Sequence, residues 1–353
     1  MNIKYTVNLM ILLFLLTISG ANAQTIDELI QSVEAGSGDF HGFAFAVIKD
    51  GKIIHKSTGG YCKYGENTPI TSKTLFPLAS VSKSITALSV MKLVNEGHVN
   101  LDEEFAFAYL KKPLTIREIL NQTTGYKFRG NKELESGVNR NQFLEEIKKQ
   151  NIKCNGCYFY SNALFSLTDE ILQQKKLSLS YAIKNFRESL GTNEIQLSPV
   201  DKKLPIASRH DLRHVYPNYG NYQLVAGAAA GVYASLDAMI EVLKVISGKR
   251  NDIISDSNLQ QLFTQYSEND DIFKWGIHLP AKVISHYGLG FRIINNKNGE
   301  AFIFHGGKIN GMFAFIGLIP RKNIGIVWMI NGRKNKERNR NVLENLINFG
   351  LSA

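Results

Sequence analysis

The stretch Phe76-Pro77-Leu78-Ala79-Ser80-Val81-Ser82-Lys83-Ser84-Ile85-Thr86-Ala87-Leu88 carries the strongest structural and chemical signals in this chain. Its apolar residues recur at helical spacing, and further apolar residues follow as far as Val94, which predicts a buried helix. We expect the helix to begin beside Pro77, because proline has the φ that a helix entry needs and its missing N–H costs little there. Ser80 and Lys83 are polar residues near the start of this mostly apolar element.

Ser80 and Lys83 have the spacing of a nucleophile and its base. Residues three apart share a helix face, so the Lys83 amine reaches the Ser80 hydroxyl. Serine is a poor nucleophile until a base removes its proton, and lysine becomes a usable base when burial disfavours its charged form. The helix N-terminus favours the negative charge that develops at Ser80. A serine that only caps the helix is the alternative.

Ser89 and Lys92 repeat the Ser-x-x-Lys pattern on the same helix. They lie about two and a half turns further along, where the helix N-terminus cannot assist. We therefore assign chemistry to the first pair and none to the second.

Residues 1–23 have the pattern of a signal peptide. Lys4 gives a basic start, an apolar run covers residues 7–18, and Ala21-Asn22-Ala23 is a small-x-small cleavage site before Gln24. The apolar run is short for a membrane-spanning helix, although an uncleaved anchor is the alternative. We expect a periplasmic or secreted protein with no stable membrane insertion after cleavage.

The chain of 353 residues is basic, with a formal net charge of +10. Cleavage after Ala23 removes one lysine and no acidic residue, which leaves a formal charge of +9. This excess could favour anionic envelope polymers or membrane surfaces, but a basic solvated surface explains it as well. The densest basic run, Arg333 to Arg340, contains no aromatic residue and matches no nucleic-acid motif, so we expect no nucleic-acid partner. We interpret it as the exposed start of a C-terminal helix.

The three cysteines are Cys62, Cys154 and Cys157. Export makes disulfides possible, and the Cys-Asn-Gly-Cys spacing of the last two is compatible with a local disulfide, a redox pair or half of a metal site. A thioredoxin-like context is missing, and we can place no further zinc ligands. We predict a local structural disulfide, with two free thiols as the alternative, and we expect no metal and no cofactor.

Hydrophobic patterns predict strands near both ends of the chain. Near the start, residues 25–35 predict a helix capped by Thr25, and residues 43–57 predict a hairpin with Asp50-Gly51 at its turn. Near the end, apolar runs punctuated by glycine, asparagine and proline predict strands before a C-terminal helix. These runs are residues 288–294, 301–304, 312–318 and 324–330.

The middle of the chain is mainly helical with long loops, and Arg117 there is expected in a structural ion pair. We predict an α/β (α+β) fold in which the two ends, residues 24–100 and 230–353, build one antiparallel sheet flanked by N- and C-terminal helices. Residues 101–229 would form an inserted, mainly helical domain. A cleft between the two parts would contain the start of the Ser80 helix, and such junctions are common binding sites.

Tyr160-Ser161-Asn162 directly precedes a helical stretch at residues 164–172. A tyrosine that faces Lys83 could give or take a proton, and cationic neighbours favour its phenolate. The Asn162 amide can accept from Lys83 and donate to a substrate carbonyl. Tyr-x-Asn also occurs twice within residues 216–221, in a loop rich in turn residues, and a half-buried aromatic residue at a helix entry is the alternative for Tyr160.

His305-Gly306-Gly307-Lys308 follows the strand predicted over residues 301–304. Two glycines at a strand end let a substrate backbone approach closely, and an extended substrate could pair with such an edge. The N–H groups of Lys308 and Ser80 could together form an oxyanion hole. A loop histidine without function is the alternative for His305.

The three motifs in this order and spacing resemble those of the serine β-lactamase and penicillin-binding-protein superfamily. The Tyr-x-Asn form is similar to the branch that holds class C β-lactamases, D-alanyl-D-alanine carboxypeptidases and related esterases. The resemblance covers nearly all of the mature chain and implies a β-lactamase/transpeptidase-like fold. Outside the motifs it includes residues 114–125, 230–237 and 287–290.

The resemblance also implies a role for each residue of the motifs. Ser80 would be the acylated nucleophile, and Lys83 and Tyr160 would be the proton-transfer pair. Asn162 would contact the substrate and the lysine, and the residues of the third motif would bind the substrate. These last are His305, Gly306, Gly307 and Lys308, whose N–H would be the second oxyanion donor.

The third motif departs from the class C pattern, which typically is Lys-Thr-Gly and helps to hold a β-lactam carboxylate. Here His305 is mostly neutral at neutral pH, and Gly306 has no hydroxyl. This weakens the case for an efficient β-lactamase, and a peptidase, amidase or esterase fits at least as well.

The leading hypothesis is an exported serine hydrolase that forms an acyl-enzyme with a D-amino-acid peptide, an ester or a β-lactam. The alternative is a non-catalytic protein that keeps the fold and binds peptidoglycan. Both imply a small-molecule or peptidoglycan-derived ligand. A metal hydrolase is disfavoured because the chain contains no His-Glu-x-x-His cluster.

Overall fold

The computed structural model describes residues 24–38, 40–201, 203–211, 214–216, 221–269, 279, 283–299, 301–332 and 336–352. The expected signal peptide at residues 1–23 lies outside these residues, as does the first part of the basic run that begins at Arg333. Among the described helices, none combines the length and the apolar character needed to cross a bilayer.

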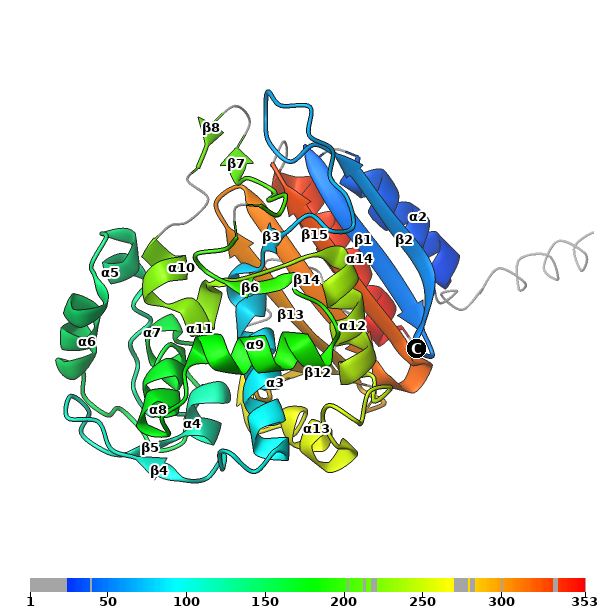
Figure 1. Ribbon diagram of the computed structural model, residues 1–353. Helices are drawn as coiled ribbons and strands as arrows, with labels where there is room; N and C mark the ends of the chain where they lie inside the picture. The colour runs from blue at the N-terminus through cyan, green and yellow to red at the C-terminus, as the bar shows by residue number, and fades with distance from the viewer. Residues whose placement is uncertain are drawn as a thin grey trace, which may run out of the picture.

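An antiparallel sheet forms the centre of the protein (Figure 1), and the described residues give it eight strands in the order β10-β11-β12-β13-β14-β15-β1-β2. The first strand pairs with the last along its whole length, from Gly42 opposite Asn331 to Lys49 opposite Ile324. The two ends of the chain therefore build one sheet, as predicted. Its strands are β1 (Gly42–Lys49), β2 (Lys52–Gly60), β10 (Ser267–Asn269), β11 (Ile284–Tyr287), β12 (Arg292–Asn295), β13 (Ala301–Ile309), β14 (Met312–Ile319) and β15 (Ile324–Asn331).

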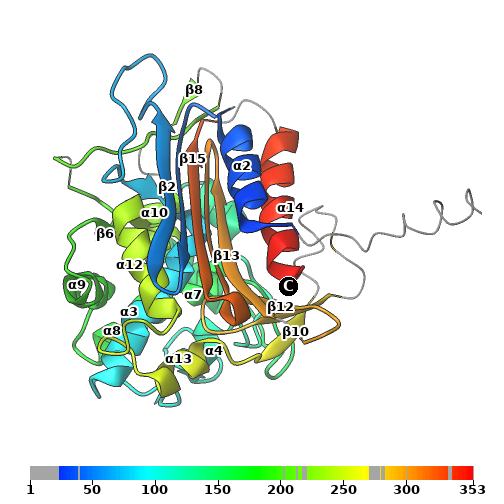
Figure 2. The ribbon, with the colours of Figure 1, turned by 90° about the vertical axis from the view of Figure 1, so that its right-hand side faces the viewer.

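Two terminal helices cover one face of this sheet, α2 (Ile26–Ser37) and α14 (Lys336–Leu351), as Figure 2 shows. Thr25 caps α2 in a capping box with Glu28, so the predicted helix and its cap are confirmed. The buried Trp328 of β15 donates through Nε1 to Ser37 Oγ at 2.9 Å, which ties α2 to the sheet. The predicted α/β class with flanking terminal helices is confirmed.

The opposite face of the sheet carries the remaining helices and is centred on α3 (Ser82–Asn95), which packs against α9 and α11. Most of α3 is buried on all sides, and it ends before Gly97, whose φ of +76° is the left-handed conformation that glycine commonly adopts after a helix. The other helices are α4 (Ile116–Leu120), α5 (Asn131–Glu135), α6 (Arg140–Lys148), α7 (Asn162–Phe165), α8 (Thr168–Gln174), α9 (Leu179–Ser189), α10 (Asn221–Val225), α11 (Gly227–Ala230), α12 (Leu236–Ile246) and α13 (Asp256–Leu262).

Short elements connect these layers. The 3₁₀ turns are η1 (Ala79–Val81) and η3 (Pro320–Lys322). The short strands are β3 (Phe76–Pro77), β4 (Glu104–Phe105), β5 (Leu114–Thr115), β6 (Ile195–Leu197), β7 (His210–Asp211), β8 (His214–Val215) and β9 (Val232–Ala234).

The helix entry predicted at Pro77 was wrong. Phe76–Pro77 pair with β9 as an edge strand of a three-stranded sheet, and the α-helix begins only at Ser82. An edge strand has one side free of ladder hydrogen bonds, so it tolerates the missing N–H of proline. Local sequence could not separate this position from a helix entry, because both accept proline for the same reason.

The strand predicted over residues 288–294 was wrong in its first half. β11 ends at Tyr287 and β12 begins at Arg292, so Gly288 to Gly290 form the connection between them. Gly290 has φ +71°, and a Cβ there would lie 2.6 Å from the backbone oxygen of Lys83. The glycine therefore permits the connection to approach α3, which a strand residue with a side chain would prevent.

The predicted disulfide between Cys154 and Cys157 is present, and Cys62 is a buried free thiol. The loop that contains the disulfide lies against Gly125, whose carbonyl accepts from Lys153 N at 2.9 Å. The loop continues directly into the Tyr160 motif.

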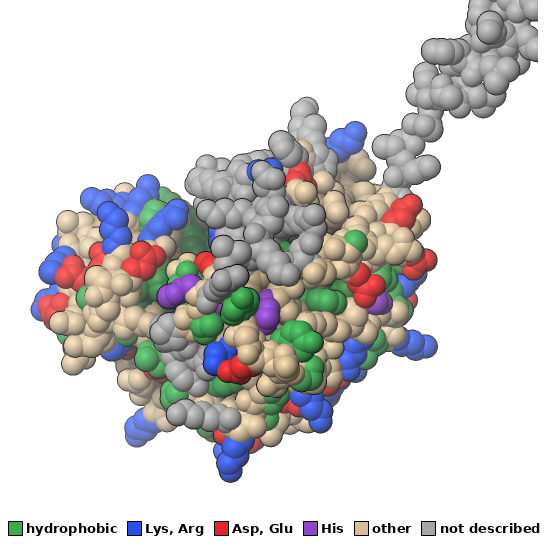
Figure 3. All heavy atoms as spheres, turned by 90° about the horizontal axis from the view of Figure 1, so that it is seen from above, with side chains coloured by type: hydrophobic (Ala, Val, Ile, Leu, Met, Phe, Trp, Pro, Cys, Tyr) green, Lys and Arg blue, Asp and Glu red, His purple; other side chains and the backbone are tan. Residues whose placement is uncertain are grey.

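Charged side chains are mixed on the face seen in Figure 3, where lysine and arginine lie among acidic residues. Such a distribution is typical of a solvated basic surface.

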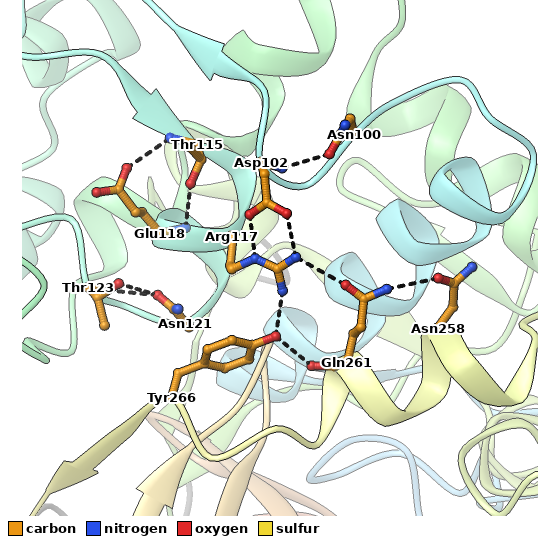
Figure 4. Close-up of polar contacts among 10 residues, drawn as sticks. All are labelled: Asn100, Asp102, Thr115, Arg117, Glu118, Asn121, Thr123, Asn258, Gln261 and Tyr266. Carbon is orange, nitrogen blue, oxygen red and sulfur yellow. Dashed lines mark hydrogen bonds and ion pairs between the residues drawn. The ribbon is translucent and has the colours of Figure 1, made fainter.

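Arg117 is a structural ion-pair residue, as predicted, and Figure 4 shows its contacts. Its guanidinium donates to both carboxylate oxygens of Asp102 at 2.6 and 2.7 Å, to Tyr266 Oη at 2.5 Å and to Gln261 Oε1 at 3.0 Å. Hydrogen bonding to this guanidinium lowers the pKa of the Asp102 carboxyl. One side chain thus joins α4 to α13 and to the segment before β10.

Replacing Arg117 with glutamine should lower the free energy of unfolding by about 1–3 kcal/mol, because charged hydrogen bonds are lost at once. Urea unfolding measures this loss. The control is Lys149→Gln, which removes a mostly exposed lysine paired with Glu146 and should cost less than about 0.5 kcal/mol. Equal losses in the two variants would mean that the contacts of Arg117 do not stabilise the connection between α4, α13 and the segment before β10.

Candidate active site

Ser80 lies in the turn η1 that precedes the buried helix α3. The residue before it, Ala79, has φ +47°, a left-handed conformation that costs a side-chain-bearing residue about 1–2 kcal/mol. Such conformations cluster at functional sites. The N-cap residues here are Leu78 for η1 and Val81 for α3, and neither makes a side-chain cap hydrogen bond, so Ser80 is not the capping serine of the alternative interpretation.

Buried hydroxyl groups hold α3 in place. Each would cost free energy if it were left without a partner, so together they fix the rotation of the helix and its position along its axis. The rotation and position of α3 in turn set the direction of the side chains near Ser80. The bonds run from Val232 N to Ser82 Oγ at 3.0 Å, from Ser84 Oγ to Gly290 O at 2.7 Å and from Thr86 Oγ1 to Ala228 O at 2.9 Å.

Lys83 lies at the centre of the site, and its side chain is 0% exposed. Its Nζ donates to Asn162 Oδ1 at 2.6 Å and to the Ala229 carbonyl at 3.0 Å, and lies 3.5 Å from Ser80 Oγ. Burial lowers the pKa of this amine. Lys83 Nζ is thus held by two firm acceptors, and Ser80 and Tyr160 are its further neighbours.

Tyr160 lies next to this pair, with its ring centre 4.8 Å from Lys83 Nζ. Burial by itself would raise the pKa of the phenol. The charges of Lys83 and Arg292 and hydrogen bonding to Ser80 and Lys83 outweigh burial and lower the pKa. Hydrogen bonds and charge therefore link Ser80, Lys83 and Tyr160 at close range.

Asn162 begins α7 and accepts from Lys83 through Oδ1, while its Nδ2 donates to Asn131 Oδ1 at 3.0 Å. One N–H of the amide stays available in this geometry. Ser161 N donates to the side-chain oxygen of Gln122 at 2.8 Å. Gln122 itself has φ +65°, a second left-handed residue with a side chain at the border of the site.

His305 is 0% exposed, and its hydrogen bonds define one tautomer. Nδ1 must donate to the Gly306 carbonyl at 2.9 Å, because a carbonyl only accepts, so Nε2 accepts from Tyr287 Oη at 3.1 Å. Burial lowers the pKa of the imidazole well below its usual value, and the charges of Arg292 and Lys83 lower it further. The third motif therefore presents a neutral histidine.

The third motif continues a strand rather than ending it, because β13 runs on to Ile309. Its partner β12 pairs only as far as Phe304, so from His305 onward that side of β13 faces η1. A Cβ on Gly307 would lie 2.1 Å from Leu78 O and 2.9 Å from Ser80 N. The absence of a side chain at Gly307 thus permits the contact between strand and turn.

The residues of the three motifs lie close together, apart from one side chain. The Tyr160 and His305 rings have their centres 6.3 Å apart, which connects the second motif to the third. Lys308 is exposed, so its side chain is not part of the buried group. Within the described parts of the chain, no three His, Cys, Asp or Glu side chains gather where they could hold a metal ion.

Arg292 and Tyr287 lie at the site although neither belongs to the three sequence motifs. The Arg292 Cζ lies 5.0 Å from the centre of the Tyr160 ring, and Tyr287 bonds His305. A signal was present in the sequence, since Arg292 is a lone charge between Phe291 and two isoleucines in a stretch that reads as buried. A buried charge requires partners, which the sequence does not name.

Replacing His305 with glutamine should flatten the pH dependence of stability. The folded protein keeps this histidine neutral below its usual pKa of 6.5, whereas the unfolded chain takes up a proton there, so stability present above pH 6.5 is lost as the pH falls. Urea unfolding at pH 7 and 5.5 should show wild type losing about 1 kcal/mol more than His305→Gln. Equal losses would mean that folding does not lower the pKa of His305.

Known proteins resemble this chain along most of its length. Protein flp from Staphylococcus aureus (strain N315) is 22% identical over 334 residues, covering 87% of this chain and 63% of that protein. D-aminopeptidase from Brucella anthropi is 24% identical over 289 residues, covering 76% of this chain and 52% of that protein. The chain thus spans less than two thirds of the length of these curated relatives.

The chain also matches a solved structure and a protein-family model. The structure of a class C beta-lactamase from Rhodobacter sphaeroides matches with a TM-score of 0.72 at 15% identity, covering 90% of this chain and 98% of that chain. At such low identity the likeness shows the fold alone. The family model described as Beta-lactamase matches residues 23–348, and the chain therefore belongs to the Beta-lactamase family.

Proposed function

We propose that this protein is an exported serine hydrolase that works through an acyl-enzyme on Ser80. The observation that carries the proposal is the environment of Lys83, whose buried amine has a lowered pKa and lies 3.5 Å from Ser80 Oγ. Its substrate would be a D-amino-acid peptide, an ester or a β-lactam. Membership of a family that contains serine hydrolases supports the reaction type.

The first step is removal of the Ser80 proton. A lysine that has lost one proton has two N–H groups and one lone pair, so it can act as a base. The short bonds from Lys83 Nζ to Asn162 Oδ1 and Ala229 O would use the N–H groups, and the lone pair would then face Ser80 Oγ. Tyr160, which also bonds Ser80, would share the proton and later give it to the leaving group.

The second step is attack of Ser80 Oγ on the acyl carbon. The bond from carbon to Oγ forms, the bond to the leaving group breaks, and water later releases the acyl group. The negative charge on the carbonyl oxygen needs donors, and we assign this role to the N–H groups of Ser80 and Lys308. The close approach of Gly307 to η1 supports this assignment, because it places the two segments side by side.

The substrate class follows from the third motif. His305 is neutral and Gly306 offers no hydroxyl, so these two positions lack the cation and the hydroxyl that help to hold a β-lactam carboxylate in the class C motif. Peptides and esters are therefore favoured over rapid β-lactam hydrolysis. D-aminopeptidase from Brucella anthropi is a relative with a peptidase name, which agrees with this preference.

Export and the domain arrangement are further parts of the proposal. The disulfide between Cys154 and Cys157 supports an oxidising compartment, since such bonds persist outside the cytosol. We also propose that residues 101–229 act as an insert that brings Tyr160 and Asn162 to a serine and a histidine from the α/β part.

A non-catalytic peptidoglycan-binding protein is the second candidate function. It would keep the fold and bind wall fragments without acylation. The buried Lys83 disfavours it, because binding alone does not require an amine with a lowered pKa beside a serine.

Replacing Ser80 with alanine should lower hydrolysis of any accepted acyl substrate by at least about 10³-fold, because the nucleophile is lost. Penicillins, p-nitrophenyl esters and D-alanyl peptides are the substrates to test, with intact-mass spectrometry to detect a covalent adduct. Ser89→Ala is the matched control, since Ser89 heads the second Ser-x-x-Lys pattern and donates to Ile85 O within the helix. It should retain activity.

The outcomes separate the two functions. An adduct or turnover that requires Ser80 supports the hydrolase. Undiminished turnover in Ser80→Ala contradicts it. Binding of peptidoglycan fragments with neither adduct nor turnover favours the non-catalytic protein.

Replacing Gly307 with alanine should slow acylation by at least about tenfold, because the new methyl group forces β13 away from η1. The free energy of unfolding should fall by about 1–3 kcal/mol. The rate of adduct formation and urea unfolding measure the two effects. Gly38→Ala is the control, since Gly38 has φ −60° and a Cβ there would lie 3.8 Å from its nearest neighbour, the Ala35 carbonyl oxygen. Wild-type acylation in Gly307→Ala would exclude this contact from the reaction.

A further inference from the structure

A buried arginine lies behind Tyr160. Arg292 is 4% exposed and begins β12, with its Cζ 5.0 Å from the centre of the Tyr160 ring and 5.6 Å from that of Tyr287. Its backbone pairs with Phe304, the residue before His305. Strand pairing therefore fixes the backbone of Arg292. Two aromatic rings flank its guanidinium, where the second and third motifs meet.

The charge of Arg292 acts on the groups that exchange protons. Arginine remains protonated at every pH at which the protein works. Burial is the largest influence on the pKa of Lys83, His305 and Tyr160. Arg292 adds to the effect of burial at Lys83 and His305, where both lower the pKa, and opposes it at Tyr160.

We propose that Arg292 is a positioning residue of the active site, whose guanidinium over the Tyr160 ring keeps the Lys83–Tyr160 pair in the form that accepts the Ser80 proton. The inference rests on the proposed acyl-enzyme function. Arg292 gives the site a fixed positive charge, which the neutral His305 of the third motif does not supply.

The number of protons on the Lys83–Tyr160 pair decides whether the pair can act as a base. With two protons the pair of Lys83 and Tyr160 carries a charge of +1 and cannot accept another. With one proton it is neutral and can take the proton of Ser80. A neighbouring cation disfavours the +1 form more than the neutral form, so Arg292 extends the accepting form to lower pH.

Several other groups surround Tyr160, but few of them carry a charge that could take the place of Arg292. Burial raises the pKa of the Tyr287 and Tyr222 phenols and lowers that of His305, so these three are neutral near pH 7. Among the residues that the structure describes, the titratable and charged groups around Tyr160 are Lys83 on α3, Tyr222 on α10, Tyr287 on β11 with Tyr158 beside it, Arg292 on β12, His305 on β13, and Glu133 and Glu135 of α5 beyond Tyr222.

The test compares Arg292→Gln, which removes the charge, with Arg292→Lys, which keeps it. In Arg292→Gln the acid limb of kcat/KM should move up by about one pH unit or more. Arg292→Lys should return the limb most of the way to wild type. Arg250→Gln is the matched control, because Arg250 pairs with Asp252 outside the site, and its acid limb should stay in place.

A second measurement needs no substrate. The ultraviolet absorbance of tyrosinate is followed against pH, and the contribution of Tyr160 is the difference from Tyr160→Phe in the same background. The Tyr160 midpoint should rise by about one pH unit or more in Arg292→Gln and much less in Arg292→Lys. Arg292→Met, which keeps a long stem against Tyr287, replaces the glutamine variant if the latter does not fold.

The outcomes distinguish this proposal from the function on which it rests. An unchanged tyrosinate midpoint in the charge-removing variant overturns the role of Arg292. An increase in KM with an unmoved acid limb also overturns it, because Arg292 would then bind substrate. Full activity of Ser80→Ala would overturn the proposed function instead, and the tyrosinate midpoint would still decide the role of Arg292.

Discussion

The burial of a single amine, that of Lys83, is the constraint on which the rest of the site depends. A charged lysine in the interior costs several kcal/mol unless acceptors surround it. Asn162 and Ala229 supply such acceptors, because α11 packs against α3 and α7 packs against α11. The same burial lowers the pKa of Lys83. The contact that organises the helices therefore also prepares the amine to accept a proton.

The central sheet brings the third motif to this amine. β1 and β15 join the two ends of the chain, and β13 reaches η1 because Gly307 has no side chain to hold the segments apart. Beyond Phe304 the strand no longer pairs with β12, and it contacts η1 instead. Strand pairing and one glycine thus position a histidine that lies more than two hundred residues from Lys83 in sequence.

The electrostatic field of the site comes from a neutral histidine and a charged arginine that lie close together. His305 is neutral in a single tautomer, since Gly306 accepts from one ring nitrogen and Tyr287 donates to the other. Arg292 is charged and lies over the Tyr160 ring. A neutral histidine beside a fixed cation produces a different field from that of a lysine in the third motif, which is why the family fold alone does not identify the substrate.

The sequence by itself determined the features that depend on nearby residues. These are the helix α2 capped by Thr25, the hairpin at Asp50-Gly51 and the disulfide between Cys154 and Cys157. The resemblance of three spaced motifs also indicated the family and the candidate group around Lys83. Only the tertiary structure decided the strand at Pro77 and the position of Arg292. Local pattern cannot give these, because the environment of a buried group is made by segments that lie far away in the chain and meet only when the sheet has formed.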